Sequence, residues 1–200
     1  MVVLAFPMVD ADAILVEKMR AGDEAAFREI VRRYQDRLLR LAESTVGSRA
    51  VAQEVTQDTW LAVLRGVDRF EGRSTFKTWL FNILMNRARS AAHKETRAGR
   101  PDENVGDERF DKNGAWANPP EPWSDRVDDR IVANDLALRL RVLLPQLPDQ
   151  QRAVLMLRDV EGLSSEDVVK MLGVSEGNQR VLLHRGRARL RALLNEELVS

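Results

Sequence analysis

A stretch without helical periodicity divides this chain of 200 residues into two halves. Residues 96–130 are rich in glycine, asparagine and acidic side chains, and their prolines exclude a continuous helix. On either side of the stretch, apolar residues recur at helical spacing, and no alternating pattern indicates a strand. The sequence therefore predicts an all-α protein with two small helical domains, at 10–95 and 131–198, joined by a flexible acidic linker at 96–130.

Three helices are expected at the start of the first domain. A short one begins near Asp12 and ends at Gly22, a longer amphipathic one spans 23–46 behind an Asp23 cap, and a third spans 50–67. The third helix is expected to turn five apolar side chains toward the core: Val51, Val55, Leu61, Val63 and Leu64.

The other side of the third helix carries a small polar cluster. Glu54, Gln57 and Asp58 lie beside Trp60 at positions that are expected to be exposed. Such a cluster is either a solvated helix face or a docking surface for a basic partner helix. The residues alone leave both interpretations open.

The stretch that follows, 69–97, carries the most distinctive chemistry of the chain. Gly72 supplies a turn, Ser74 is placed to cap, and a helix is expected over 75–93. One face of this helix is aliphatic and is formed by Leu80, Leu84, Ala88 and Ala91. An adjacent face is formed by Phe76, Trp79, Ile83 and Asn86.

A basic fringe surrounds that second face. Its members are Arg73, Lys77, Arg87, Arg89, Lys94 and Arg97. Aromatic and aliphatic walls accept an unstacked base, an amide reads its edge, and cations hold phosphates, so the combination suits a single DNA strand. The alternative is that Phe76 and Trp79 pack inside the domain, with a solvated charged rim around them.

The second domain is predicted to contain a helix-turn-helix. Ordered structure is expected to resume with a helix at 132–144 and another at 149–158. Ser164 or Ser165 caps a helix that ends at Leu172, Gly173 suits a left-handed turn, and Ser175 caps a final helix at 176–197. Two helices joined by such a short glycine turn form this motif.

The final helix separates apolar from basic side chains. Leu182, Leu183, Gly186, Leu190 and Leu193 fall on one side, and Arg180, His184, Arg187 and Arg191 fall on the other. Arginines on an exposed helix can enter a DNA major groove, and the amides behind Ser175 suit a phosphate. The alternative is an arginine-rich surface helix in solvent.

Composition narrows the function further. The chain has no cysteine and two histidines, which argues against metal sites and thiol chemistry, and no nucleophile or phosphate-cradling motif suggests an enzyme. No cofactor is therefore expected. The apolar start of the chain is too short for a signal sequence and no run reaches membrane-spanning length, so a cytoplasmic protein without membrane insertion is expected. Formal net charge is zero, but the 73–100 and 180–191 segments are basic and the linker is acidic.

Two blocks of the sequence together resemble a sigma factor of bacterial RNA polymerase, of the compact extracytoplasmic-function type. The first block is EVTQDTWLAVLRGVDRFEG followed by STFKTWLFNILMNRARS, and it resembles the segments that bind core polymerase and melt the promoter. The second is LPDQQRAVLMLRDVEGLSSEDVVKMLGVSEGNQRVLLHRGRARLRALL, and it resembles the reader of the upstream element. The resemblance covers nearly the whole chain.

The resemblance implies a role for each candidate residue. The surface that docks on core polymerase comprises Glu54, Gln57, Asp58 and Trp60. The pocket and strand-binding surface for the −10 element comprises Phe70, Arg73, Lys77, Trp79, Ile83, Asn86, Arg87 and Arg89, with a flipped base held by Phe70, Ile83 and Asn86. The helix for the −35 element carries Ser175, Arg180, His184, Arg185, Arg187 and Arg191.

The implied partners are core RNA polymerase, through its clamp helices and flap, promoter DNA, and an anti-sigma factor. The acidic linker matches the segment that is threaded toward the polymerase active site. Two departures stand out: Gln53 replaces a usual acid, and residues 177–182 read Gly-Asn-Gln-Arg-Val-Leu, with Leu182 at a frequent arginine position. A helix-turn-helix regulator that binds duplex DNA without polymerase is the alternative function, but it leaves Asn86 and Gln57 without a role.

Overall fold

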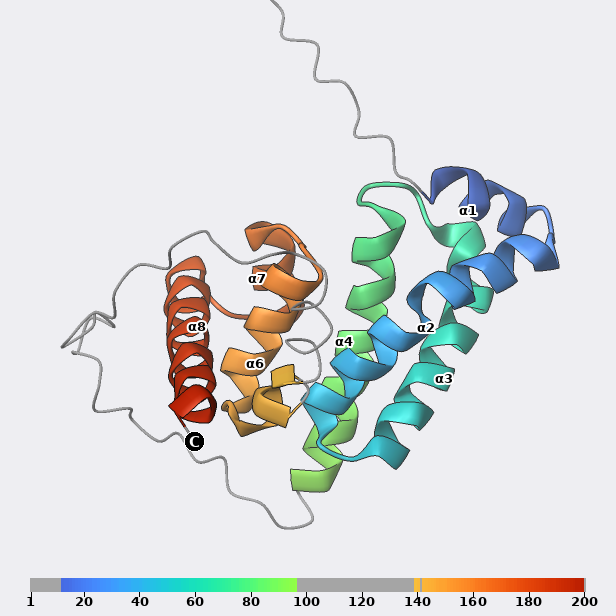
Figure 1. Ribbon diagram of the computed structural model, residues 1–200. Coiled ribbons are helices and arrows are strands. Elements are labelled where there is room, and N and C mark those ends of the chain that lie inside the picture. The colour runs from blue at the N-terminus through green and yellow to red at the C-terminus, as the bar shows by residue number, and fades with distance from the viewer. Residues whose placement is uncertain (1–11, 97–138, 141, 200) are drawn as a thin grey trace, which may run out of the picture. The chain divides into compact units, whose positions relative to one another are not determined.

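The computed structural model describes residues 12–96, 139–140 and 142–199, and all regular structure within these ranges is helical (Figure 1). The chain separates between Lys94 and Glu95 into two compact units. These observations confirm the predicted all-α class with two helical parts. The expected linker lies outside the described residues except for its first position, Thr96, which ends a helix.

The first unit contains α1 (Ala13–Arg20), α2 (Glu24–Val46), α3 (Arg49–Gly66), a 3-10 turn η1 (Val67–Arg69) and α4 (Phe76–Thr96). Local signals set these bounds. The Asp23 carboxylate accepts from the amides of Ala25 and Ala26 at 2.8 and 3.2 Å, and so caps α2. Gly47 ends α2 with φ 71°, and Ser48 caps α3.

Tyr34 of α2 is the centre of an aromatic core in the first unit. Its ring lies edge-on to Phe76 and Phe81 of α4, with centroids 6.4 and 6.3 Å away, and both phenylalanines are fully buried. The Arg37 guanidinium lies 5.3 Å from the Tyr34 ring centroid. This cluster holds α4 against α2, and therefore Phe76 is a core residue rather than part of an open aromatic face.

Asp12 ties α1 to α2 and does not cap α1 with its side chain. Its carboxylate is 2% exposed and accepts hydrogen bonds from Arg33 and from the Tyr34 hydroxyl. A buried carboxylate needs such partners because it has lost its hydration. The Asp12 side chain therefore contacts residues more than twenty positions away along the chain.

Two further expectations for the first unit are wrong. Thr75, not Ser74, caps α4: the amide of Thr78 donates to the Thr75 hydroxyl oxygen at 3.1 Å. Leu61 and Leu64 are not core residues, because they are 47% and 49% exposed on α3. The core side of α3 is instead formed by Ala52, Val55, Thr56, Thr59, Trp60 and Val63.

The second unit contains a helical segment at 139–140 and 142–143, η2 (Leu144–Gln146), α6 (Asp149–Leu155), a π-helical turn η3 (Met156–Val160), α7 (Ser165–Leu172) and α8 (Glu176–Val199). Ser164 caps α7, and Gly173 ends it with φ 66°. The Ser175 hydroxyl oxygen accepts from the Asn178 amide at 3.2 Å at the start of α8. The predicted helix-turn-helix is thereby confirmed, and the earlier part of the expected 132–144 helix lies outside the described residues.

The core of the second unit is aliphatic. Leu147, Val154, Leu155 and Leu183 are buried together, with partly buried leucines packed around them. α8 lies so close to α6 that a Cβ at Gly186 would come within 3.2 Å of the Gln151 carbonyl oxygen. A Cβ at this position would require the Gln151 backbone to shift by a few tenths of an ångström, so the glycine allows the close approach of the two helices.

Candidate nucleic-acid and polymerase interface

The polar cluster of α3 is exposed, but Trp60 does not belong to it. Glu54, Gln57 and Asp58 all face solvent. Trp60 is 8% exposed, its indole N–H donates to the Gln35 side-chain oxygen at 2.6 Å, and its ring lies edge-on to Phe27. The tryptophan therefore packs α3 against α2, on the side of α3 opposite the exposed polar cluster.

An apolar side chain extends the same surface. Leu61 follows Glu54, Gln57 and Asp58 at the helical spacing of i+7, i+4 and i+3, and it is 47% exposed. Single exposed leucines are common on protein surfaces, but at this spacing Leu61 lies beside the acid and amide groups and adds apolar area to the same surface. Periodicity in the sequence had placed Leu61 in the core.

Phe70 and Trp79 form an aromatic wall where the chain enters α4. Their ring centroids are 5.1 Å apart, and Phe70 is only 8% exposed. Trp79 is half-buried, and a Cβ at Gly66 would lie 3.4 Å from its indole. Gly66 thus lets the Trp79 ring approach the end of α3 closely. Phe70 is ordered by this packing rather than presented as an open ring.

Farther along α4, the expected reading residues reach solvent. Asn86 is exposed and donates to the Asn82 side-chain oxygen at 3.4 Å, a long contact that leaves the amide able to exchange partners. Ile83 is half-buried one turn earlier, and Arg89 is exposed. The α4 surface therefore combines an aliphatic wall with an amide and a cation.

Three residues of the basic fringe make contacts within the first unit, and the Lys94 side chain and Arg97 lie outside the described residues. The Arg87 guanidinium of α4 lies 3.3 Å from the Asp58 carboxylate of α3, and Arg73 lies 2.8 Å from Glu71. The Lys77 ammonium nitrogen lies 5.9 Å from the Phe81 ring centroid. Asp58 therefore belongs to two surfaces at once, the polar cluster of α3 and the basic fringe of α4.

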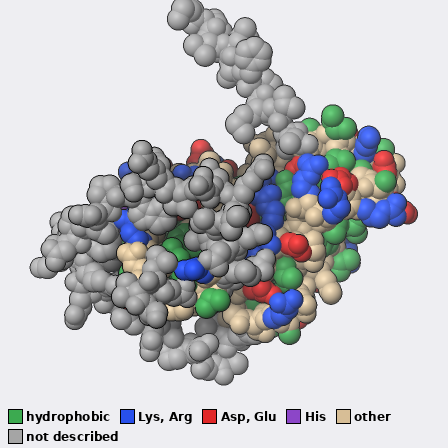
Figure 2. All heavy atoms as spheres, in the orientation of Figure 1, with side chains coloured by type: hydrophobic (Ala, Val, Ile, Leu, Met, Phe, Trp, Pro, Cys, Tyr) green, Lys and Arg blue, Asp and Glu red, His purple; other side chains and the backbone are tan. Residues whose placement is uncertain are grey.

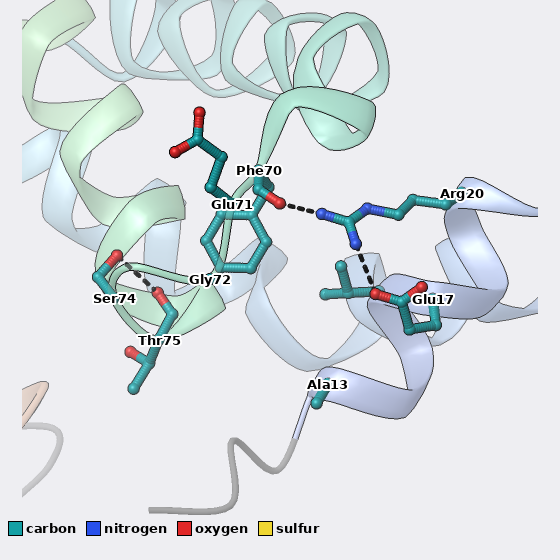
Figure 3. Close-up of a pocket in the computed structure, with 9 residues that line it drawn as sticks. Ala13, Glu17, Arg20, Phe70, Glu71, Gly72, Ser74 and Thr75 are labelled. Carbon is teal, nitrogen blue, oxygen red and sulfur yellow. Dashed lines mark hydrogen bonds and ion pairs between the residues drawn. The ribbon is translucent and has the colours of Figure 1, made fainter. Parts of the chain in front are cut away.

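A pocket between α1 and the Gly72 turn adjoins the Phe70 ring (Figure 3). Arg20 closes one side of it: its Nε donates to the Val67 carbonyl at 3.1 Å, and another nitrogen donates to the Phe70 carbonyl. Glu17 receives a third contact from the same guanidinium at 2.5 Å. Arg20 thus fixes the backbone that leads into the turn, and through it the position where α4 begins.

On α8 the exposed arginines are paired with carboxylates. Arg180 contacts Glu176 along the same helix at 3.3 Å, with both side chains largely exposed. Arg187 contacts Asp159, which comes from η3, through two hydrogen bonds of 2.7 and 2.6 Å. The hydrogen bond to Asp159 raises the pKa of Arg187 above its usual value.

The other residues expected on α8 differ in exposure. His184 is exposed, whereas Arg185 and Arg191 are half-buried. Gln179 is 1% exposed and accepts from the Ser165 hydroxyl at 2.9 Å, so it joins α7 to α8 and does not face DNA. Leu182 packs against the aliphatic core. Two of the residues at 177–182 that differ from the usual family sequence, Gln179 and Leu182, therefore pack inside the second unit.

Acidic and basic side chains are interspersed on the surface over α1 to α3, where the space-filling view shows no patch of a single sign (Figure 2). Within the described ranges, no group of three or more histidine, aspartate or glutamate side chains could hold a metal ion. None of the helices in those ranges combines the length and the apolar character needed to cross a membrane.

Sequence comparison finds the same two blocks. Residues 30–98 match the family model described as Sigma-70 region 2, and residues 137–190 match the one described as Sigma-70, region 4. The chain is 32% identical to the RNA polymerase sigma-H factor of Pseudomonas aeruginosa, over 89% of this chain and 91% of that protein. It is 31% identical to the ECF RNA polymerase sigma factor SigM of Mycobacterium tuberculosis, over 92% of this chain and 85% of that protein.

Solved structures show a related fold. CnrH in complex with the cytosolic domain of CnrY is 25% identical, with a TM-score of 0.59 over 94% of this chain and 99% of that one. The sigma factor RpoE of Bartonella quintana, in complex with the anti-sigma factor NepR, is also 25% identical with a TM-score of 0.59, over 84% of this chain and 96% of that one.

Proposed function

The chain belongs to the extracytoplasmic-function group of the sigma-70 family and is an alternative sigma factor that directs RNA polymerase to promoters, and on this premise we propose that its two units contact the promoter at separate elements. The observation that carries the proposal is that each of two separately packed units exposes polar and basic side chains on one helix, α4 in the first and α8 in the second.

In the first unit, α4 binds the non-template strand of the −10 element and helps to melt it. Asn86 hydrogen-bonds the edge of a base that has left the stack, Ile83 lines the same site, and Phe70 supports it from the buried side. Arg73, Lys77, Arg87 and Arg89 hold backbone phosphates around the base. Trp79 supports this site from beneath through its packing on Gly66.

In the second unit, α8 enters the major groove of the −35 element. Arg180, His184 and Arg187 occupy exposed positions on one side of the helix, and Arg185 and Arg191 flank them. Ser175 orders the start of α8, where backbone amides and the helix dipole favour a phosphate. Arginine in the major groove recognises guanine through paired hydrogen bonds.

Core polymerase binds the α3 surface formed by Glu54, Gln57, Asp58 and Leu61. Its acidic and amide groups complement a basic partner helix, and Leu61 adds apolar contact area. The protein acts with the polymerase in the cytoplasm and performs no covalent chemistry itself. A protein that covers α4 and α8, as an anti-sigma factor would, is a further expected partner.

The proposal is tested by assembling the full chain with core polymerase and measuring transcription from a library of promoters. We expect retention on the polymerase and defined start sites. Asp58→Arg should weaken retention because it reverses a charge at the docking surface, whereas Glu24→Arg, which reverses a charge on a largely exposed side chain of α2, serves as the control. Tight sequence-specific footprints by the free protein, without any binding to polymerase, would instead favour the stand-alone regulator.

A further inference from the structure

Arg187 and Asp159 form the most specific ion pair on the α8 surface. The Arg187 Nε donates to one carboxylate oxygen of Asp159 at 2.7 Å, and Nη2 donates to the other at 2.6 Å. This is a two-point contact between residues 28 positions apart. By contrast, Arg180 makes one 3.3 Å contact with Glu176 on the preceding turn of the same helix. Two-point contacts fix the plane of a guanidinium, whereas a single contact leaves it free to turn.

Asp159 is itself held in place. It lies in the π-helical turn Met156–Val160, a type of turn that often occurs at functional positions. The turn is closed by the Glu161 amide, which donates to the Met156 carbonyl at 2.8 Å, and Leu157 within it is fully buried. The Arg158 side chain donates to the Leu163 carbonyl after the turn. The Asp159 carboxylate therefore extends from a turn whose backbone is held in place by hydrogen bonds and by the burial of Leu157.

The contact determines which edge of Arg187 remains for other acceptors. Asp159 occupies the edge formed by Nε and Nη2. The edge formed by Nη1 and the second hydrogen of Nη2 points away from the carboxylate, and the side chain is 56% exposed. That edge is a planar pair of donors, which matches the O6 and N7 acceptors of guanine in the major groove.

We propose that Asp159 is a positioning residue for base recognition, which presents the Nη1–Nη2 edge of Arg187 to a guanine of the −35 element. The inference rests on the proposed function, in which α8 enters the major groove. Prior ordering reduces the conformational entropy that Arg187 loses on binding DNA, and so increases the discrimination that the contact provides. The carboxylate also offsets the charge of Arg187, which lowers its attraction to phosphates at sequences without the guanine.

The test uses holoenzyme formed from the full chain and core polymerase, with −35 sequences selected from a randomised promoter library. Arg187→Ala and Asp159→Asn should relax preference for guanine at the same position, by roughly 5-fold to 100-fold, the range expected for one paired base contact. The two variants should have opposite effects on the affinity for DNA that lacks the selected −35 sequence. Arg187→Ala should weaken binding, whereas Asp159→Asn should strengthen it and steepen the salt dependence, by about 0.9 in the logarithmic slope.

Three further variants separate positioning from general effects. Glu166→Gln removes the same charge from an exposed ion pair with Lys170 on α7, so it should leave base preference unchanged. The double variant Asp159→Asn/Arg187→Ala should lose no more preference than Arg187→Ala alone, because Asp159 acts through Arg187. Asp159→Glu should restore part of the preference lost in Asp159→Asn.

The inference is overturned if Asp159→Asn keeps full preference while Arg187→Ala loses it, or if the two losses add in the double variant. In both cases the wild-type protein would still select a −35 sequence, so the proposed function would stand. If the wild-type holoenzyme selects no upstream sequence at all, both the proposed function of α8 and this inference fail.

Discussion

The two units order their candidate DNA-binding residues by different means. In the first, Phe70 and Trp79 contact one another and a core that also contains Tyr34, Phe76 and Phe81. In the second, residues 139–199 contain no phenylalanine, tyrosine or tryptophan, and the two exposed arginines of α8, Arg180 and Arg187, instead contact carboxylates at the surface. One unit relies on packing, and the other on ion pairs around an aliphatic core.

This difference predicts whether a substitution in each unit can alter DNA recognition without also altering the free energy of unfolding. Aromatic packing is worth several kcal/mol and is shared between the core and the DNA surface in the first unit, so changes there affect both. An exposed ion pair contributes at most about 1 kcal/mol, so changes on α8 should alter recognition while the fold persists.

The largest effect is expected from Phe76→Ala. Phe76 is fully buried between Tyr34 and Phe70, so its truncation should destabilise the first unit by about 3 to 5 kcal/mol through lost burial and a cavity. Urea unfolding of the full chain, followed by circular dichroism, measures this. Leu64→Ala is the control, because a leucine that is 49% exposed should cost far less. Similar losses of unfolding free energy in the two variants would show that the aromatic core contributes no more than an exposed leucine.

A pH effect is expected from Tyr34. Burial, and then its hydrogen bond to Asp12, raise the pKa of the Tyr34 hydroxyl above its usual value of about 10. Below about pH 10 the phenol is protonated in folded and unfolded chains, and its contribution to stability is complete. As pH rises further, only the unfolded chain ionises, so stability falls by up to about 1.4 kcal/mol per pH unit.

This effect can be isolated because Tyr34 is the only tyrosine of the chain. Its ultraviolet absorbance reports ionisation directly in the folded protein, and unfolding experiments at increasing pH report stability. Tyr34→Phe should show a weaker decline above about pH 10 than the wild type. Ionisation of Tyr34 near its usual pKa in the folded protein would contradict the prediction and weaken the case for a sealed Asp12 contact.

A smaller and more specific effect is expected from Asn86→Ala. The exposed side chain should contribute little to folding, but the loss of one hydrogen bond to an unstacked base should slow open-complex formation about five-fold, corresponding to about 1 kcal/mol. Closed-complex binding, measured on the same promoter at low temperature, serves as the internal control. Equal losses in both steps would show that Asn86 has no special role in melting.

The smallest effect on stability is expected from Asp58→Asn. The pair with Arg87 is exposed, so unfolding free energy should change by less than about 1 kcal/mol. Loss of the carboxylate should, however, let Arg87 attract phosphate more strongly and increase binding of the free protein to single-stranded DNA by a few-fold. Arg87→Ala in the same background should cancel the gain. A gain that survives this second change would come from general charge instead.

The sequence alone predicted the helices and their ends with few errors, because these depend on neighbours within about four residues. Asp23, Ser164, Gly173 and Ser175 stand at the ends that their chemistry favours. The family resemblance likewise depended on order and spacing along the chain. Ser74 was wrong by a single position, since neighbouring Thr75 has an equally suitable hydroxyl.

What the sequence could not decide was which side of a helix meets another helix. Trp60 and Phe76 are buried whereas Leu61 and Leu64 are exposed, because the position of α2 against α3 and α4 decides it, not the spacing within one helix. The ion pairs of Asp12 with Arg33 and of Asp159 with Arg187 could not be predicted from the sequence either. Local spacing fixes where a helix begins and ends, but contacts between distant residues arise only when the helices pack, and tertiary structure alone brings these charges together.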